Sequence, residues 1–374
     1  MIKSIIEYFI DLVKIDSETQ HENAVAQKLA KDLRELGAQV KFDNANAKAG
    51  GDIGNLYGYF PGNIKKEPIL FCAHMDTVQP GIGIKPQIRD GKIFSDGTTI
   101  LGSDDKSGIA EIICGIKGLL DSGEKHAPIE VLFTIAEETG LLGAKHLDYA
   151  MIKSRIGYAL DSHVVGSIAV GAPAQNSLKF TVIGKESHAG VAPEKGINAI
   201  KIAAEAISIM PMGRIDAETT CNVGIIQGGK ATNIIPNEVM VKAEARSHNQ
   251  ASLKKITEQM TDAFINTAKK YKLGDYQAKV DIKISQEYQA FLLSDEDDVV
   301  QIAEKAAENL GIKFTKIVGG GGSDVNIFNQ HGLTMAVAGT GMENVHSVDE
   351  FIEISELETG ALWVKEIIRL HSQK

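Results

Sequence analysis

Residues 129–136 form a near-continuous apolar run, and two adjacent acids, Glu137 and Glu138, follow it directly. Such a run is typical of a strand that is buried on both faces of a sheet. Shorter apolar runs at 69–73 and 156–160 predict further strands, and helical patterns lie between them. Strands that alternate with helices predict an α/β sandwich.

Three helical segments are predicted near these strands. Thr19 and Glu22 have the spacing of a capping box, so a helix is expected to follow them and to end at Gly37. A second helix is predicted at 105–120, and residues 139–149 also have a helical pattern.

The middle of the chain has a different pattern. The predicted order there is strand, helix, strand, strand, helix, strand, which is a ferredoxin-like βαββαβ unit. Its elements are expected at 178–184, 196–209, 221–227, 238–246, 249–272 and 279–285. After residue 291 the α/β pattern resumes and ends with a helix at 355–372. We therefore predict one discontinuous α/β domain, 1–176 with 289–374, and an inserted domain at 177–288.

Composition excludes several classes of protein. The chain has 374 residues, 43% of them hydrophobic, which is enough for two domains with a sizeable core. A net charge of -10 argues against nucleic acid as a partner and suits a site that concentrates acids around a cation. Cys72, Cys114 and Cys221 are widely spaced without a CxxC pair, which favours a reducing cytoplasm. Glu7 and Asp11 interrupt the apolar start, so we expect neither a signal peptide nor a membrane span.

Metal-binding chemistry is suggested where the predicted strands end. His74 and Asp76 are two residues apart after the 69–73 strand, so both side chains can reach one place. A histidine ligand usually gives its second ring nitrogen to a carboxylate, which predicts His74 as a ligand and Asp76 as its support. The plain alternative is a buried histidine beside an acid.

Two more acid pairs follow. Two metal ions need a bridging carboxylate, and Asp104 or Asp105 can supply it from a glycine-flanked turn. One would bridge and the other would cap or orient, and spacing leaves the choice open. Glu137 and Glu138 can divide two tasks, one binding metal and one holding a proton. The alternative for that pair is a solvated loop.

Asp161 follows the 156–160 strand, and His346 lies in a turn-rich loop after a predicted strand at 333–338. In open α/β sheets, ligands bind outside the carboxyl ends of the strands. A bridge, two histidines and two acids would give three protein ligands per metal and leave a position for water. Such a mixed set favours zinc or its neighbours.

These motifs together resemble metallopeptidase family M20, and within it the tripeptidase T-like branch. The resemblance rests on His74-Met-Asp76-Thr77, the run 97–112 with Asp104-Asp105-Lys106-Ser-Gly108, Glu137-Glu138, the run 143–148, Ser187-His188-Ala-Gly190, and His346 before Glu350-Phe351. It implies a zinc-peptidase-like α/β sandwich as the catalytic domain and an inserted lid that usually makes a homodimer.

The resemblance also implies roles for the metal ligands. By the pattern Asp-x-Lys-x-Gly, Asp104 would be the bridge. His74 and Asp161 would complete one metal site, and Glu138 and His346 the other. The implied cofactors are two Zn²⁺ per subunit, with Co²⁺ or Mn²⁺ as substitutes.

Catalysis and substrate binding are implied in the same way. Glu137 would be the general base, and His188 would stabilise the oxyanion, often from across the dimer. Asn233 and Arg246 match positions that touch substrate in relatives. The chain departs from the family at Gly320, where relatives often carry an arginine, and this puts strict tripeptide recognition in doubt.

The expected function is a dinuclear aminopeptidase that removes the N-terminal residue of small peptides. One alternative is a deacylase or dipeptidase of the same family, acting on N-acyl amino acids or dipeptides. Alternatives from another class are a nucleotide-binding protein that uses the glycines at 319–322 and a peptide receptor without catalysis. The first lacks the Lys-Ser/Thr of a P-loop, and the second would have no need of Glu137.

Overall fold

The computed structural model describes residues 4–373. The chain divides into two compact units. The main unit comprises the residues through Gly171 together with Leu292–Gly319 and the segment from Ser323 onward, and the inserted unit comprises Ala172–Phe291 with Gly320–Gly322. The assignment of catalytic and lid roles to separate domains stays a prediction.

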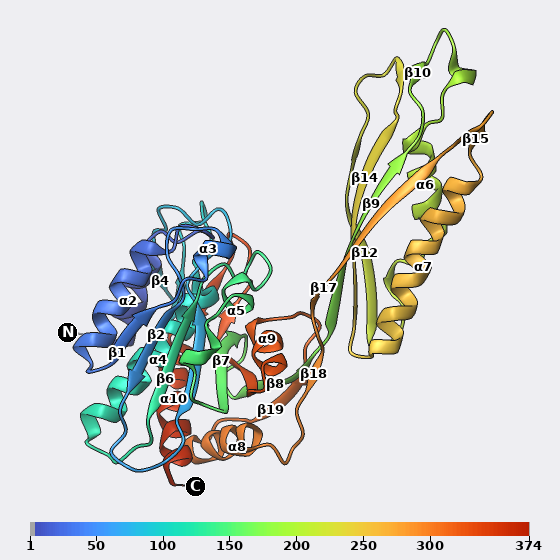
Figure 1. Ribbon diagram of the computed structural model, residues 1–374. Helices are drawn as coiled ribbons and strands as arrows, with labels where there is room; N and C mark the ends of the chain where they lie inside the picture. Colours follow the sequence, from blue (N-terminus) through green and yellow to red (C-terminus); the bar gives the residue numbers. More distant parts are fainter. Residues whose placement is uncertain (1–3, 374) are drawn as a thin grey trace. The chain divides into compact units, whose positions relative to one another are not determined.

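A large mixed sheet forms the centre of the main unit (Figure 1). Its strand order is β1-β2-β6-β3-β7-β20-β8-β18, and β19 pairs with β8. The strands are β1 Gln39–Phe42, β2 Leu56–Phe60, β3 Ile69–His74, β6 Ile129–Thr134, β7 Ile156–Ser162, β8 Ser167–Ala172, β18 Phe291–Leu292, β19 Thr315–Val318 and β20 Thr334–Gly339. The four neighbours β6, β3, β7 and β20 run parallel. Their carboxyl ends therefore meet at one edge of the sheet.

Helices pack on this sheet through apolar side chains. One buried cluster joins Phe9, Leu29, Ile113 and Trp363 to alternate residues of β3, such as Phe71. The helices of this cluster are α1 Ile5–Val13, α2 Asn23–Glu35, α4 Ser103–Ser122, α8 Asp298–Leu310 and α10 Ile354–Gln373. The shorter helices are α3 Asn46–Ala49, α5 Leu142–Lys145 and α9 Asp324–Gln330, and α9 contacts β7 and β20. The predicted α/β class is confirmed.

A small antiparallel sheet lies beside the start of α4. Its order is β21-β22-β5-β4. The strands are β4 Gln87–Arg89, β5 Lys92–Phe94, β21 Met342–Glu343 and β22 Phe351–Glu353. The hairpin of β21 and β22 encloses the loop that carries His346.

The inserted unit has the order β9, α6, β12, β14, α7, β17, which is the predicted βαββαβ order. Its main sheet runs β11-β12-β14-β9-β17, and the rings of Phe180 and Phe264 stack at 4.0 Å between sheet and helix. The elements are β9 Ala174–Ile183, α6 Ala199–Ile209, β11 Gly213–Arg214, β12 Thr219–Gly228, β14 Glu238–Ser247, α7 Gln250–Lys269 and β17 Lys279–Tyr288. Two short ladders pair β10 Ser187–His188 with β13 Ile234–Ile235, and β15 Lys272–Leu273 with β16 Tyr276–Gln277.

Two local predictions were wrong. The helix predicted at 139–149 is reduced to α5, because Gly140 and Leu141 both have positive φ and prevent a helix from starting earlier. The capping box of Thr19 and Glu22 does not form. Glu22 itself is the N-cap of α2 without a side-chain cap, and the Thr19 hydroxyl donates to Asp76 instead.

Within residues 4–373, no helix has the length and apolar character needed to cross a membrane.

Candidate metal centre

The carboxyl edge of the parallel strands carries the predicted ligands. His74 is the last residue of β3, and Asp161 lies next to the end of β7. Glu137 and Glu138 follow β6, and Ala136, with φ 48°, turns the chain between strand and acids. Parallel neighbours bring these strand ends side by side, so sequence-distant acids share one space.

Asp104 lies between two histidines. Its Oδ1 is 2.9 Å from Nε2 of His74, and its Oδ2 is 3.0 Å from Nε2 of His346. The two oxygens of one carboxylate thus face different imidazoles, which is the arrangement a bridging ligand needs. The backbone of Asp104 and Asp105 is not helical although both lie at the start of α4, and this turns the Asp104 side chain to the site.

The remaining predicted ligands lie beside these histidines. Glu138 Oε1 is 2.9 Å from Nε2 of His346, and Asp161 Oδ1 is 4.0 Å from Nε2 of His74. The structure therefore brings all five predicted ligands together. Ligand atoms within 4.8 Å of one another define two overlapping groups. These groups are His74 with Asp104 and Glu138, and His74 with Asp105 and Asp161.

The second nitrogen of His74 bonds to backbone rather than to a carboxylate. Its Nδ1 is 2.9 Å from the carbonyl oxygen of Asp76, and 3.5 Å from the Asp76 Oδ1. Donation to this carbonyl places the proton on Nδ1 and leaves the Nε2 lone pair directed to the centre. Asp105 adds a further restraint, because its Oδ2 accepts the backbone N–H of His74 at 3.1 Å. Asp105 thus contacts the backbone of His74, and its role at the centre stays a prediction.

The Asp76 carboxylate holds the turn after β6. Its Oδ1 accepts the N–H of Glu137 at 3.0 Å. Its Oδ2 accepts the Thr19 hydroxyl at 2.7 Å and the N–H of Glu138 at 3.3 Å. Asp76 is fully buried, so these bonds fix the backbone of both glutamates.

The buried acids titrate abnormally. Burial raises the pKa of Glu137 and of Asp161 well above the usual range. Hydrogen bonds to Asp104 and Glu138 raise the pKa of His346 to about 10. Burial raises the pKa of Asp104, but hydrogen bonds from the two histidines outweigh it and hold the pKa low. Such a concentration of carboxylates around two imidazoles fits divalent cations, because cations would offset the charge that burial penalises.

Three buried acids at this edge escaped prediction. Glu22 accepts the N–H of Ala136 at 3.1 Å, and burial raises its pKa to about 7. Asp324, at the start of α9, has a pKa raised to about 6 by burial. Glu350 contacts the turn before α4. Glu22 was assigned to a cap, Glu350 was quoted only as part of the family resemblance, and no sequence pattern singled out Asp324.

His188 and Asn233 lie together in the inserted unit. The Nδ1 of His188 accepts the N–H groups of Gly190 and Val191, both at 3.2 Å. Acceptance by Nδ1 assigns the ring proton to Nε2, and His188 is an exposed residue. The Asn233 carbonyl accepts the N–H of Ala189 at 2.9 Å, next to His188.

Arg246 lies at the other end of β14. It forms a bidentate pair with Glu244, with Nε to Oε1 at 3.1 Å and Nη2 to Oε2 at 3.0 Å. A side chain added at Gly321 would come within 3.9 Å of its Nη1, so the guanidinium lies against the glycine loop. His188 pairs with Ile234, before β14 begins, whereas Arg246 is eight residues beyond Glu238, the first residue of β14, which is about 26 Å along the strand at ~3.3 Å per residue.

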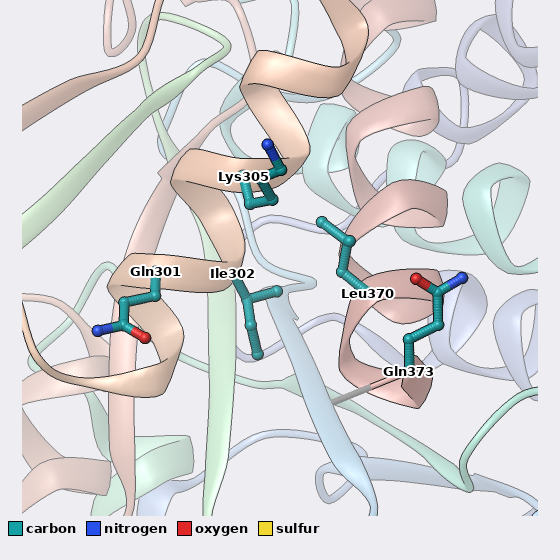
Figure 2. Close-up of a pocket in the computed structure, with 5 residues that line it drawn as sticks. All are labelled: Gln301, Ile302, Lys305, Leu370 and Gln373. Atoms are coloured by element: carbon teal, nitrogen blue, oxygen red, sulfur yellow. The ribbon is translucent and has the colours of Figure 1, made fainter.

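A separate surface cavity of about 410 Å³ lies between α8 and α10 (Figure 2). Its lining comprises Gln301, Ile302, Lys305, Leu370 and Gln373. None of these described residues is an acid or a histidine, and none is a predicted site residue.

Comparison with known proteins identifies the family. The family described as peptidase family M20/M25/M40 matches residues 70–370. The chain belongs to this metallopeptidase family. Its metal centre is therefore a family property, and the geometry above contains two candidate metal-binding groups.

Individual relatives match almost the whole chain. The Bacillus subtilis protein YqjE is 43% identical over 98% of both chains. A crystal structure of aminopeptidase PepT from Bacillus cereus superimposes with a TM-score of 0.89 at 42% identity, covering 99% of this chain and 98% of that one. A tripeptidase structure from Staphylococcus aureus gives a TM-score of 0.93 at 38% identity, with coverage of 99% and 98%.

Proposed function

We propose that this protein is a dinuclear metal-dependent aminopeptidase that removes the N-terminal residue of tripeptides. The observation that carries the proposal is the position of Asp104, with one carboxylate oxygen toward His74 and the other toward His346. The names aminopeptidase PepT and tripeptidase, given to proteins similar over their full length, support the same activity.

In this proposal the metal ligands divide into two sets. His74 and Asp161 would hold one metal ion, Glu138 and His346 would hold the other, and Asp104 would be shared between them. Bound metal ions supply Lewis acidity toward the scissile carbonyl and toward water. The mixed nitrogen and oxygen donors favour zinc, with cobalt or manganese as substitutes.

Glu137 acts as the general base. Its backbone is held by Asp76, while its partly buried side chain lies among the acids of the centre. A carboxyl with a raised pKa is suited to accept a proton from the attacking water and pass it to the leaving amine. Asp76 contributes by positioning Glu137 and Glu138.

His188 serves as a donor to the oxyanion through its Nε2–H, and Asn233 and Arg246 bind the substrate. One inserted unit cannot place both His188 and Arg246 on one tripeptide. His188 pairs with Ile234, before β14 begins, and the stretch of β14 from Glu238 to Arg246 is itself about 26 Å long, whereas three extended residues span at most about 10 Å. This separation favours a homodimer in which His188 acts on the partner's substrate.

Three free cysteines, Cys72, Cys114 and Cys221, suit a reducing compartment, so we propose a cytoplasmic location.

Gly320 motivates the second candidate function. Relatives of the tripeptidase branch often carry an arginine there, and its absence removes one anchor for a peptide carboxylate. A deacylase or dipeptidase that uses the same centre on N-acyl amino acids or dipeptides would then depend on Arg246 as the clamp.

The test joins metal content to hydrolysis. The protein is stripped with chelator, zinc, cobalt or manganese is added back, and tripeptides, dipeptides and N-acyl amino acids are assayed. Tripeptide cleavage that returns at about two metals per chain supports the aminopeptidase. Cleavage of acylated amino acids alone would move the protein to the deacylases. Metal binding without any turnover would favour a peptide receptor.

A further inference from the structure

Glu350 binds the turn that begins α4 through both carboxylate oxygens. Oε2 accepts the N–H of Leu101 at 2.7 Å and the N–H of Gly102 at 2.8 Å. Oε1 accepts the Ser103 hydroxyl at 2.5 Å and the N–H of Asp104 at 3.1 Å. Glu350 is 1% exposed, so the protein itself supplies these four donors.

This arrangement requires an ionised carboxylate. A carboxylate offers about four acceptor positions, and here a donor occupies each of them. Burial raises the pKa of Glu350, whereas the bonds from Ser103, Asp104 and Gly102 favour the charged form. A glutamine of the same shape would direct an NH₂ group at two donors.

Glu350 also supplies the cap that α4 lacks. The N-cap residue Gly102 makes no side-chain cap, and Asp104 and Asp105 are not helical. The N–H groups at such a terminus have no partner within the helix. A negative charge placed there is further favoured by the helix dipole.

Glu350 also lies at the end of the loop that carries His346. Glu350 directly precedes β22, which pairs with β21 through Phe351 and Glu343. Inside the hairpin, the Ser347 hydroxyl donates to the carbonyl of Asn344, and the N–H of Glu350 donates to the carbonyl of Ser347. His346 itself has φ 62°, a backbone that needs support from its surroundings.

We propose that Glu350 is a positioning residue that fixes the His346 loop against the Asp104 turn and thereby sets the metal affinity of the centre. The inference rests on the proposed dinuclear function. Four hydrogen bonds on one side and a short hairpin on the other leave little freedom between Asp104 Oδ2 and His346 Nε2, which are 3.0 Å apart. We call these four hydrogen bonds from residues 101–104 the Glu350 clamp. Loss of this clamp should weaken the metal site formed by Asp104, Glu138 and His346 more than the other site.

The chain offers a matched control in Glu130. This glutamate is also fully buried and accepts the Tyr57 hydroxyl at 2.5 Å and the N–H of Ser154 at 2.7 Å. It lies near the start of β6, whereas the centre lies beyond the other end of that strand. Glu130→Gln therefore disturbs a comparable network without touching the metal centre.

The experiment titrates cobalt into chelator-stripped wild type, Glu350→Gln and Glu130→Gln, with thermal unfolding measured on each. Outer partners of metal ligands typically contribute about 10–100-fold in affinity. We expect Glu350→Gln to weaken one of two cobalt sites by that factor and to change the visible cobalt spectrum. Glu130→Gln should lower the unfolding temperature and leave affinity and spectrum unchanged.

Ser103→Ala covers the case in which Glu350→Gln does not fold. It removes a single bond to Oε1, so a smaller shift in the same site is expected. Wild-type affinity and spectrum in the folded variants would overturn the positioning role while leaving the proposed function intact. Fewer than two cobalt sites in the wild type would overturn the proposed function and this inference together.

Discussion

The carboxylate of Asp76 accepts the backbone N–H of Glu137 at 3.0 Å. The same residue offers its carbonyl oxygen to Nδ1 of His74. Asp76 therefore ties a proposed base to a proposed metal ligand, although its side chain does not take the role of a direct carboxylate partner of the histidine. Asp76 thus holds the backbone of both acids that follow β6, Glu137 and Glu138.

Glu137 and Glu138 should respond differently to the same substitution. Glu137→Gln should retain fold and bound metal and lower kcat by about 10²–10⁴-fold, because it removes only the proton acceptor. Glu138→Gln should lose metal, since its Oε1 lies 2.9 Å from His346 Nε2. Metal analysis and steady-state kinetics on both proteins check this pair. Normal turnover by Glu137→Gln would contradict the assignment.

Thr19→Val should weaken catalysis from outside the centre. The substitution removes the hydroxyl that donates to Asp76 Oδ2 at 2.7 Å and leaves that buried oxygen with the longer bond from Glu138. We expect a loss of about 1–3 kcal/mol in the free energy of unfolding and a lower kcat. Denaturant unfolding and kinetics measure both effects. Thr359→Val, on the exposed face of α10, is the control and should change neither.

Asp104→Asn should abolish paired metal binding. An amide oxygen can still face one histidine, but the nitrogen cannot act as a ligand on the other side. Metal content after dialysis should fall from about two ions per chain to one or fewer. Two tightly held ions in this variant would exclude Asp104 as the bridge.

Glu111 should make stability depend on pH. It is fully buried in α4 against Gly360, and burial raises its pKa well above the ordinary value of 4.5. The folded state then holds a proton that the unfolded state releases, so stability is lost as pH rises above 4.5. Glu111→Gln should gain stability relative to wild type as pH rises. Urea unfolding at a series of pH values tests this, and a difference that is constant with pH would refute it.

A side chain at Gly360 is expected to clash with Glu111. A Cβ atom there would lie 2.2 Å from Cδ of Glu111, so Gly360→Ala should destabilise the protein by about 1–3 kcal/mol. The loss should be smaller when Glu111 is also replaced by alanine. A double-mutant cycle measures this coupling, and strict additivity would show that the two sites do not interact.

Sequence patterns predicted several strands of the main sheet and the site residues that lie at the ends of these strands. The apolar runs before His74 and Glu137 predicted the strands β3 and β6 to within a few residues. Because these strands are parallel, their carboxyl ends lie at the same edge of the sheet. The choice between Asp104 and Asp105 needed the family resemblance, because spacing cannot show which carboxylate faces two histidines. The structure gives the two acids separate contacts, to imidazoles and to the His74 backbone.

Tertiary hydrogen bonds explain what sequence patterns missed. Thr19 has a local signature for capping, yet its hydroxyl bonds to Asp76, 57 residues away. Glu350 belongs to a motif of the family resemblance, but no local pattern predicts its contacts, because its partners lie nearly 250 residues earlier in the chain. The β8 strand, Ser167–Ala172, also escaped prediction. Interactions across such separations depend on the finished fold and leave no periodic trace in the sequence.

The clamp at Glu350 has a consequence for biosynthesis. A ribosome makes the Asp104 turn first, then the whole inserted unit, and only afterwards the residue that caps α4, 246 positions after Asp104. Until then the acids of the sheet edge lack both His346 and the clamp. The nascent chain therefore cannot complete its centre early, and a polypeptide that stops before this hairpin carries the acids without His346 and without the bonds of Glu350.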